Sequence, residues 1–253
     1  MLPSYISKLS EVPIFPMVDI LGSLDEKIEY YEKLLKDLEQ YGFLLYKNLF
    51  EDKTVEKEKV SLTEIAEFYS GYSYSGEELC DKSNKGLATI KNFERNGGFK
   101  IDGYKAINIS GKIKPTMYAQ KGDLLVAHTD LTQNADIIGN PIILLNLASY
   151  QQIIISMDLV KVVSKTITTE LLYFILKSQS FKGHALGYCS GTTVLHLSKI
   201  ALNEYYFDLP TDREKISVLS DKLKVIFKRI ELVIEEIQNL SKLKDLYLQK
   251  FFG

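Results

Sequence analysis

The sequence predicts an α+β protein in which a β-rich globular domain is flanked by two long helices that pair as an antiparallel coiled coil. Three observations predict this fold. Apolar residues recur at heptad spacing near both ends of the chain, and short β-rich runs separated by turn residues fill the middle. The 253 residues are 45% hydrophobic and 25% charged, an ordinary composition that allows one large or two modest domains.

The C-terminal region, residues 211–253, carries the clearest heptad pattern. Its apolar residues alternate steps of three and four positions, and neither Gly nor Pro interrupts the run before Phe252. Thr211 followed by Glu214 predicts the start of the helix as a capping box. A helix of this length needs a partner for its apolar stripe. The predicted seam is Ile216, Leu219, Leu223, Ile226, Ile230, Val233, Ile237 and Leu240.

The N-terminal region supplies that partner. Residues 1–23 hold three of the six prolines and no clear period, which predicts an irregular leader. Ser23 with Glu26 predicts a capped helix over residues 24–50, interrupted in its seam by Gly42. The seam recurs 202 positions later, where Ile230 corresponds to Ile28, so the connecting helix is an internal repeat. The predicted seam is Leu24, Ile28, Tyr31, Leu35, Leu38, Leu45 and Leu49.

Residues 53–210 are predicted to form the sheet-rich domain, entered through a charge-rich linker at 51–59. Thr168 or Thr169 predicts the cap of one helix that extends to Ser180. Pro210 is predicted to end the domain. The β-rich runs that predict strands are 87–90, 105–109, 123–127, 142–147, 153–163, 193–197 and 205–207.

Charge is unevenly distributed along the chain, although its sum is only −2. Residues 1–52 contain ten acids and five bases, whereas residues 82–121 contain nine bases and two acids, a local balance of +7. Such a stretch is either a solvated face or an attractive surface for nucleic acid. The longest apolar run, 153–157, is too short to span a membrane, and no signal-peptide pattern is present, so we expect a cytoplasmic protein.

A convincing set of catalytic residues is missing from the sequence. It has no phosphate-binding Gly loop, no Gly-x-Ser-x-Gly elbow and no His-Glu-x-x-His pair. Asn140-Pro141-Ile142 differs from the Asn-Pro-Pro-aromatic tetrad of adenine methyltransferases. His128 and Asp130 form too small a ligand set for a metal enzyme, and Cys80 and Cys189 are spaced neither for a disulfide framework nor for zinc. We therefore expect no metal and no cofactor on this chain.

Three polar runs remain, at 91–98, 128–134 and 187–193, each rich in side chains that can bond base edges. Arg pairs bidentately with guanine, and Asn or Gln with adenine, in the major groove. Alternatively, each run is an ordinary turn whose side chains bond their own backbone. The predicted DNA contacts are Lys91, Asn92, Arg95, Asn96, Lys100, His128, Thr129, Asp130, Thr132, Gln133, Asn134, Ser190, Thr192 and Thr193.

The order of these features resembles the DNA-specificity subunits of type I restriction-modification systems, over nearly everything after residue 20. The resemblance rests on Lys121-Gly-Asp-Leu-Leu and the loop to Gln133, followed by Ile137-Ile-Gly-Asn-Pro141. It also rests on Thr169-Glu-Leu-Leu-Tyr-Phe-Ile-Leu-Lys-Ser178, on the Gly187 to Ser198 run, and on Pro210 before a helix that ends in Leu248-Gln-Lys-Phe-Phe252.

The resemblance implies a target-recognition domain at 53–210 that reads one half of a bipartite DNA site. The family's subunit is not an enzyme: companion methyltransferase subunits use S-adenosylmethionine, and a restriction (motor and nuclease) subunit uses ATP. Its helices set the distance to the second half-site and dock the methyltransferase.

This chain departs from the family pattern because it has one recognition domain where full-length members have two. It resembles a half-sized subunit, which implies either a homodimer that reads a spaced palindrome or pairing with a different half. A competing hypothesis from the residues alone is a coiled-coil assembly module whose central domain binds protein.

Overall fold

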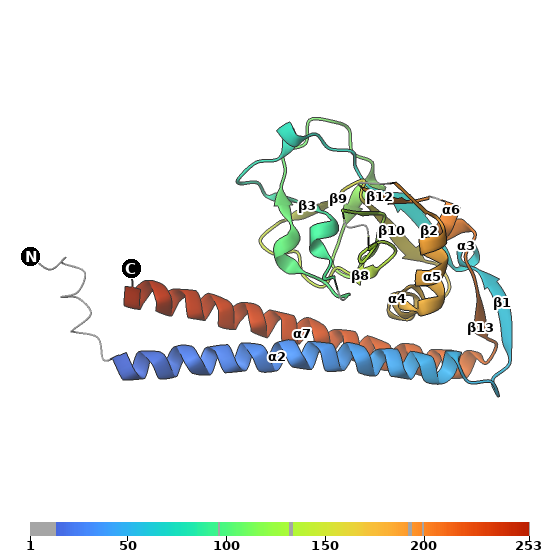
Figure 1. Ribbon diagram of the computed structural model, residues 1–253, viewed down its shortest axis with the longest axis horizontal. Coiled ribbons are helices and arrows are strands. Elements are labelled where there is room, and N and C mark those ends of the chain that lie inside the picture. Colours follow the sequence, from blue (N-terminus) through green and yellow to red (C-terminus); the bar gives the residue numbers. More distant parts are fainter. Residues whose placement is uncertain (1–13, 96, 132–133, 192–193, 199, 253) are drawn as a thin grey trace, which may run out of the picture. The chain divides into compact units, whose positions relative to one another are not determined.

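The structure is a computed structural model that describes residues 14–95, 97–131, 134–191, 194–198 and 200–252 (Figure 1). The chain divides into two compact units. The first combines residues 1–41 with 225–253, and the second comprises residues 42–224. Two long helices run through both units: α2 (Ile14–Phe50) and α7 (Arg213–Phe252).

The first unit is an antiparallel helix pair, as the sequence predicts. Helices α2 and α7 lie side by side, and Lys244 near the end of α7 forms an ion pair with Asp25 near the start of α2 (Figure 1). The seam residues Leu24, Ile230 and Val233 are buried, because each helix covers the apolar stripe of the other. The predicted fold class is therefore confirmed.

The predicted starts of both long helices are wrong, by ten residues at α2 and by two at α7. Helix α2 begins at Ile14, so residues 14–23 are helical and not irregular, and the rest of the predicted leader lies outside the described residues. Pro16 is tolerated because the first helical turn needs no N–H bonds. Ser23 lies inside the helix, where its hydroxyl donates to the carbonyl of Ile20 at 2.8 Å. At α7 the cap is Asp212, which accepts from the Lys215 amide at 3.0 Å.

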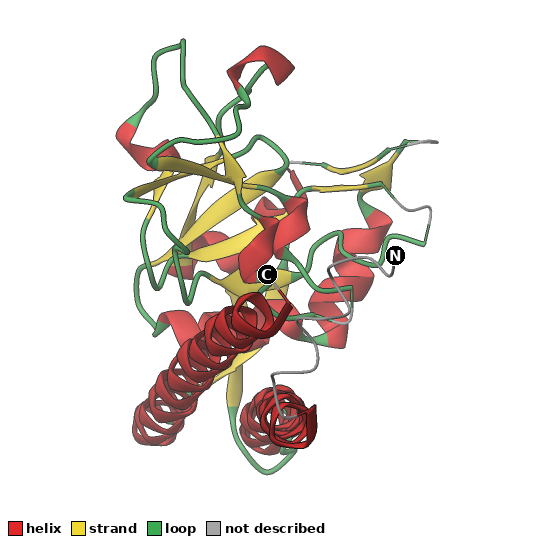
Figure 2. Cartoon of the chain, turned by 90° about the vertical axis from the view of Figure 1, so that its left-hand side faces the viewer, coloured by secondary structure: helices red, strands yellow, loops and turns green. Residues whose placement is uncertain are grey.

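The second unit contains the strands, in short pieces joined by long loops (Figure 2). They are β1 (Lys57–Ser61), β2 (Ala66–Ser70), β3 (Lys85–Ala88), β4 (Lys105–Ala106), β5 (Tyr118–Ala119), β6 (Leu124–Ala127), β7 (Thr129–Asp130), β8 (Pro141–Ile143), β9 (Gln152–Ile155), β10 (Leu159–Ser164), β11 (Cys189–Ser190), β12 (Leu195–Leu197) and β13 (Tyr206–Pro210).

Among the described residues these strands form two four-stranded sheets, ordered β2-β10-β6-β8 and β4-β3-β9-β5, and two smaller sheets, β11-β12-β7 and β1-β13. Strands β3 and β9 are parallel, and the other named pairs are antiparallel. The main core contains Leu125 and Ile142 from one four-stranded sheet and Ile153 and Ile155 from the other, so it lies between them.

Short helices complete the second unit. They are α3 (Leu62–Ile65), α4 (Thr169–Lys177), α5 (Gln179–Gly187) and α6 (Ile200–Asn203), with 3-10 turns at η1 (Gly76–Glu78), η2 (Ile90–Asn92), η3 (Ile101–Gly103) and η4 (Pro115–Met117). Residues Leu171 to Leu176 of α4 are all buried, so this helix is covered on every side. The helix predicted to reach Ser180 ends at Lys177, because Ser178 turns the chain and caps α5 through the Phe181 amide.

Most predicted strands are present with shifted ends, but two predictions about connections are wrong. The run at 153–163 is two strands, β9 and β10, separated by a turn at 156–158. The linker predicted at 51–59 ends in strand β1, whose residues Lys57 to Ser61 pair with β13. Its Glu58 and Lys59 are exposed and its Val60 and Ser61 are buried, so the charged part of the strand faces solvent.

Candidate nucleic-acid interface

The first polar run forms a narrow loop after η2. Phe93 pairs with Phe99 in an isolated antiparallel bridge, and the amide of Glu94 donates to the carbonyl of Gly98 at 3.0 Å. Gly97 and Gly98 have φ values of 87° and 110°, in the left-handed region that favours glycine. The glycines of this run therefore close a tight hairpin.

Asn92 supports this loop from inside. Its side chain is fully buried, accepts from the Thr89 amide at 3.0 Å and donates to the Lys100 carbonyl at 3.0 Å. Both ends of the amide are thus used within the protein. The prediction that Asn92 contacts DNA is contradicted by this burial.

Three basic side chains in or just after the first run face solvent. Lys91, Arg95 and Lys100 are exposed, with Lys100 in an ion pair at 3.8 Å to the exposed Asp102. Exposed ion pairs of this kind are weak and leave the ammonium group accessible. Asn96 lies outside the described residues.

The second polar run begins on strand β7 with two buried residues. Thr129 donates its hydroxyl to Asp158 at 3.2 Å, and the Asp130 carboxylate accepts from the Ile137 amide at 2.7 Å. The prediction that Thr129 and Asp130 contact DNA is therefore contradicted, because both side chains are directed inward. The neighbouring His128 is half-buried.

The chain after β7 turns back over helix α5. Thr132 and Gln133 lie outside the described residues, and Asn134 is exposed. The ammonium group of Lys182 on α5 donates to the carbonyls of Ala135, Asp136 and Ile138 at 2.9, 3.2 and 2.7 Å. It also donates to the side-chain oxygen of Asn140 at 3.0 Å. Burial lowers the pKa of Lys182, and the nearby Asp130 opposes that shift.

The third polar run is the hairpin between β11 and β12. Ser190 is exposed, and Gly191 has a φ of 120°. A Cβ atom there would lie 2.1 Å from the carbonyl oxygen of Val194, so the turn requires glycine. Thr192 and Thr193 lie outside the described residues.

The structure brings the three runs into one part of the second unit. Strand β12 pairs with both β11 and β7, which places the second and third runs in one sheet. The first run approaches helix α4, where a Cβ on Gly97 would lie 3.3 Å from the Lys177 ammonium. The segment that follows the second run packs on helix α5, where a Cβ on Gly139 would lie 2.9 Å from the Ala185 Cβ. Consecutive helices α4 and α5 thus lie beside the first run and beside the segment that follows the second run.

Two charged residues that bond several loops of this unit were not predicted from the sequence. Besides Lys182, the buried Glu78 accepts from the amide and hydroxyl of Ser110 at 2.8 and 2.7 Å, from the Tyr72 hydroxyl at 2.7 Å and from the Ser75 amide at 2.9 Å. These bonds lower the pKa of Glu78 to about 2. The only local signal is the capping box of Ser75 and Glu78, while the bond to Ser110 spans 32 residues.

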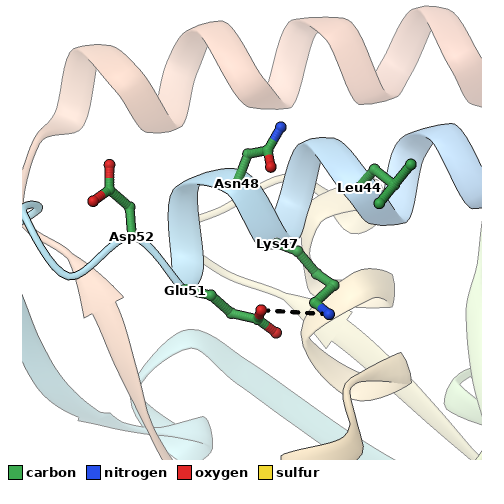
Figure 3. A pocket seen from close by; sticks show the side chains of 5 residues that line it. All are labelled: Leu44, Lys47, Asn48, Glu51 and Asp52. Atoms are coloured by element: carbon green, nitrogen blue, oxygen red, sulfur yellow. Dashed lines mark ion pairs between the residues drawn. The ribbon is translucent and has the colours of Figure 1, made fainter.

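An open hollow on the last turns of α2 is lined by five residues that include Leu44, Asn48 and Asp52, and Lys47 and Glu51 form an ion pair beside it at 3.4 Å (Figure 3). None of the predicted DNA contacts lines it. The described residues contain no cluster of three metal-binding side chains, and Cys80 and Cys189 are free thiols. No described helix is both long and apolar enough to cross a bilayer.

No family model and no curated protein matches the sequence. Among solved structures, the S subunit of the type I restriction-modification system from M. genitalium is similar to this chain at a TM-score of 0.60 and 15% identity. The alignment covers 94% of this chain and 60% of that protein, so this chain spans less than two thirds of that protein's length.

Two further structures have lower scores. One is described as showing complex assembly and conformational transition of the type I R-M system, and the other is the HsdS subunit from Thermoanaerobacter tengcongensis. Both are 15% identical with a TM-score of 0.48, and cover 94% of this chain and 57% or 56% of theirs. At 15% identity the first likeness concerns architecture only: this chain has the fold of a type I restriction-modification S subunit.

Proposed function

We propose that this chain is a non-catalytic DNA-specificity subunit of a type I restriction-modification complex. In this proposal, residues 53–210 form the target-recognition domain and read one half of a bipartite site on double-stranded DNA. The observation that carries it is the fold, which over 94% of the chain is that of an S subunit. Such a role would place the protein in the cytoplasm, where it meets DNA.

The distribution of charge supports DNA as the ligand. The protein as a whole carries −2, but the exposed side chains of Lys91, Arg95 and Lys100 project from one loop region. Phosphate attraction depends on such local positive charge, more than on the net charge. Arg95 at the tip of its hairpin is the exposed residue best suited to pair with guanine.

The helix pair supports the docking of other subunits. On α2, Tyr30 and Tyr41 are 62% and 55% exposed, and on α7 Leu232, Leu243 and Leu246 are 42%, 41% and 62% exposed. Tyr30 and Tyr41 precede Leu232 and Leu243 by 202 positions each, so both helices repeat this row. Exposed apolar rows on helices are typical of partner surfaces. We propose that a helix of the methyltransferase subunit binds there.

In the proposed complex, this chain supplies recognition and other subunits supply the chemistry. The methyltransferase subunit would use S-adenosylmethionine and a restriction subunit would use ATP, with no cofactor on this chain. With one recognition domain, the chain would act as a homodimer or pair with a different half-subunit. Sedimentation analysis of the chain, alone and with a methyltransferase subunit, measures which assembly forms.

A binding experiment tests DNA recognition directly. The full chain with its methyltransferase subunit is incubated with a randomised duplex pool, and the recovered sequences are used to measure Kd across a salt series. We expect enrichment of a defined sequence and an affinity that falls by orders of magnitude between about 50 and 200 mM salt. A flat salt response with no enrichment would refute the proposal and favour the protein-binding assembly module. Lys59→Ala, an exposed lysine on β1, is the control for general charge loss.

A further inference from the structure

Lys182 makes an unusual set of bonds for a lysine on a domain surface. Its ammonium group lies within 3.2 Å of four oxygens, three of them backbone carbonyls from the segment 135–138 and the fourth the side-chain oxygen of Asn140. An ammonium has three N–H donors, so every donor is used within the protein. Lys182 is therefore committed to this segment.

The convergence of the carbonyls requires a positive charge. Carbonyl oxygens carry partial negative charge, and three that point at one place repel each other unless a cation lies between them. Here the cation is the Lys182 ammonium, which helix α5 holds at a fixed position. Without it we expect the carbonyls of Ala135, Asp136 and Ile138 to turn apart, and the segment to change its course.

The backbone of the same segment is strained and tightly packed. Ala135 has a φ of 53°, a left-handed conformation that is unfavourable for any residue with a Cβ and persists only when its surroundings hold it. Gly139, at φ 75°, lies so close to α5 that an added Cβ would be 2.9 Å from that of Ala185. On the other side, the Asp130 carboxylate accepts from the Ile137 amide at 2.7 Å.

We propose that Lys182 is a positioning residue for DNA recognition, which sets the course of residues 134–140 and thereby the direction in which the exposed Asn134 meets a base. This inference rests on the proposed function. It assigns to Lys182 a role through backbone geometry, since its own ammonium group is used by the protein and does not contact DNA. A lysine that bound phosphate would instead be exposed and would contribute equally to all sequences.

The test compares Lys182→Met with Lys182→Arg in the full chain, with its methyltransferase subunit where DNA is bound. Met keeps the aliphatic stem and removes the charge, while Arg keeps the charge in a planar group that cannot direct three donors to one point. Lys165→Met is the matched control, because the exposed Lys165 donates to a single carbonyl, that of Thr63 at 2.6 Å. Hydrogen exchange of residues 134–140 and selection from a randomised duplex pool are the two readouts.

For Lys182→Met we expect faster exchange in residues 134–140 and about a 10-fold or greater loss of preference for the enriched sequence, the range that one base contact supplies. The affinity for an unrelated duplex, and the dependence of that affinity on salt, should stay the same. A general loss of structure would change both. Lys182→Arg should show hydrogen exchange and sequence preference between those of wild type and Lys182→Met. The Arg variant also provides the test if the Met variant does not fold.

The two proposals fail in different ways. A wild-type chain that enriches no sequence overturns the proposed function and this inference with it. A wild-type chain whose enriched sequence is preferred equally by both Lys182 variants overturns the inference alone. Unchanged exchange of residues 134–140 in Lys182→Met also overturns it, because the segment then keeps its course without the ammonium group.

Discussion

Glu78 joins three segments of the second unit through its side chain. Its carboxylate accepts four hydrogen bonds, from Tyr72, Ser75 and the amide and hydroxyl of Ser110, and so joins segments far apart in sequence. A carboxylate that accepts several such bonds remains ionised to low pH. The residues between 78 and 110 include most of the basic stretch, so Glu78 also helps to fix where those charges lie.

Replacing Glu78 should make the protein less sensitive to acid while lowering its stability at neutral pH. The pKa of Glu78 in the folded protein is lowered to about 2, below its unfolded value. Its contribution is therefore complete above the unfolded pKa and is lost as pH falls towards 2. Urea titrations of wild type and Glu78→Gln between pH 7 and pH 3 should show a stability difference that shrinks as pH falls. A stability difference that stays constant with pH would show that the hydrogen bonds of Glu78 do not depend on its ionised carboxylate.

Two basic residues of the first loop should affect DNA binding in different ways. Lys91→Ala should weaken binding to all duplexes alike and reduce the salt slope by about 1, because a lysine on phosphate reads no sequence. Arg95→Ala should instead relax preference at one base pair by about 1–3 kcal/mol. Competition titrations against base-substituted duplexes separate these outcomes. Equal effects of Arg95→Ala on every duplex would assign Arg95 to the backbone.

At the residue scale, the sequence predicted the polar runs but could not separate exposed from internal side chains. Asn92, Thr129 and Asp130 have the same chemistry as base-reading residues, and local sequence holds no sign that they are buried. Their partners show why: Asn92 bonds Lys100 eight positions away, and Thr129 bonds Asp158 twenty-nine positions away. Only the folded chain brings these partners together.

Helix α2 illustrates at the element scale why a glycine interrupts its seam. Gly42 is buried, and a Cβ there would lie 2.6 Å from the ring of Phe174 on α4. Phe174 is itself fully buried and packs against Phe43 and Tyr46 at ring-centroid distances of 6.2 and 6.4 Å. The helix is continuous through Gly42, so the glycine serves close packing and is not a break.

A pair of glycine substitutions in α2 should therefore act in opposite directions. Gly42→Ala should destabilise the protein by about 1–3 kcal/mol, because the buried ring of Phe174 has no room to move. Gly22→Ala, where no atom lies within 4 Å of the added Cβ, should stabilise it by up to about 1 kcal/mol through helix propensity. Thermal unfolding followed by circular dichroism measures both. Stabilisation by Gly42→Ala would show that the contact with Phe174 is loose.

Elements with a strong period were predictable, and elements defined by distant pairing were not. The heptad spacing of α2 and α7 and the apolar runs of β6 and β9 are local signals. Strand β1 is charged because it lies in a two-stranded sheet, and only its pairing with β13, about 150 residues away, makes it a strand. Helix α5 was missed because its Gly183 and Gly187 weaken the helical pattern that Ser178 nevertheless caps.

The molecule as a whole has the architecture that its sequence pattern predicts, because two heptad helices at opposite ends of a chain bury their stripes against each other. The sequence could not fix how the loops fold between them. Those loops hold the candidate site, and their shapes depend on single long-range contacts such as those of Lys182 and Glu78.

The exposed row on the helix pair gives a prediction at this scale. Leu246→Glu should abolish or strongly weaken co-purification with a methyltransferase subunit and leave thermal stability unchanged, because Leu246 is exposed in the free chain. Gln40→Glu adds the same charge at an exposed position outside the row and should have no effect. Equal loss in both variants would point to charge and not to an apolar contact.

The ion pair of Asp25 with Lys244 holds the outer parts of α2 and α7 next to each other. The start of α2 lies eleven residues beyond Asp25 and the end of α7 eight residues beyond Lys244, so the two helix ends should be roughly 10 Å apart. A short splice would connect them, and the chain could be opened at the exposed turn between Ala148 and Ser149. Such a circular permutant should fold to the same structure and melt cooperatively. Helices α2 and α7 would still pack against each other, although their order along the chain is changed.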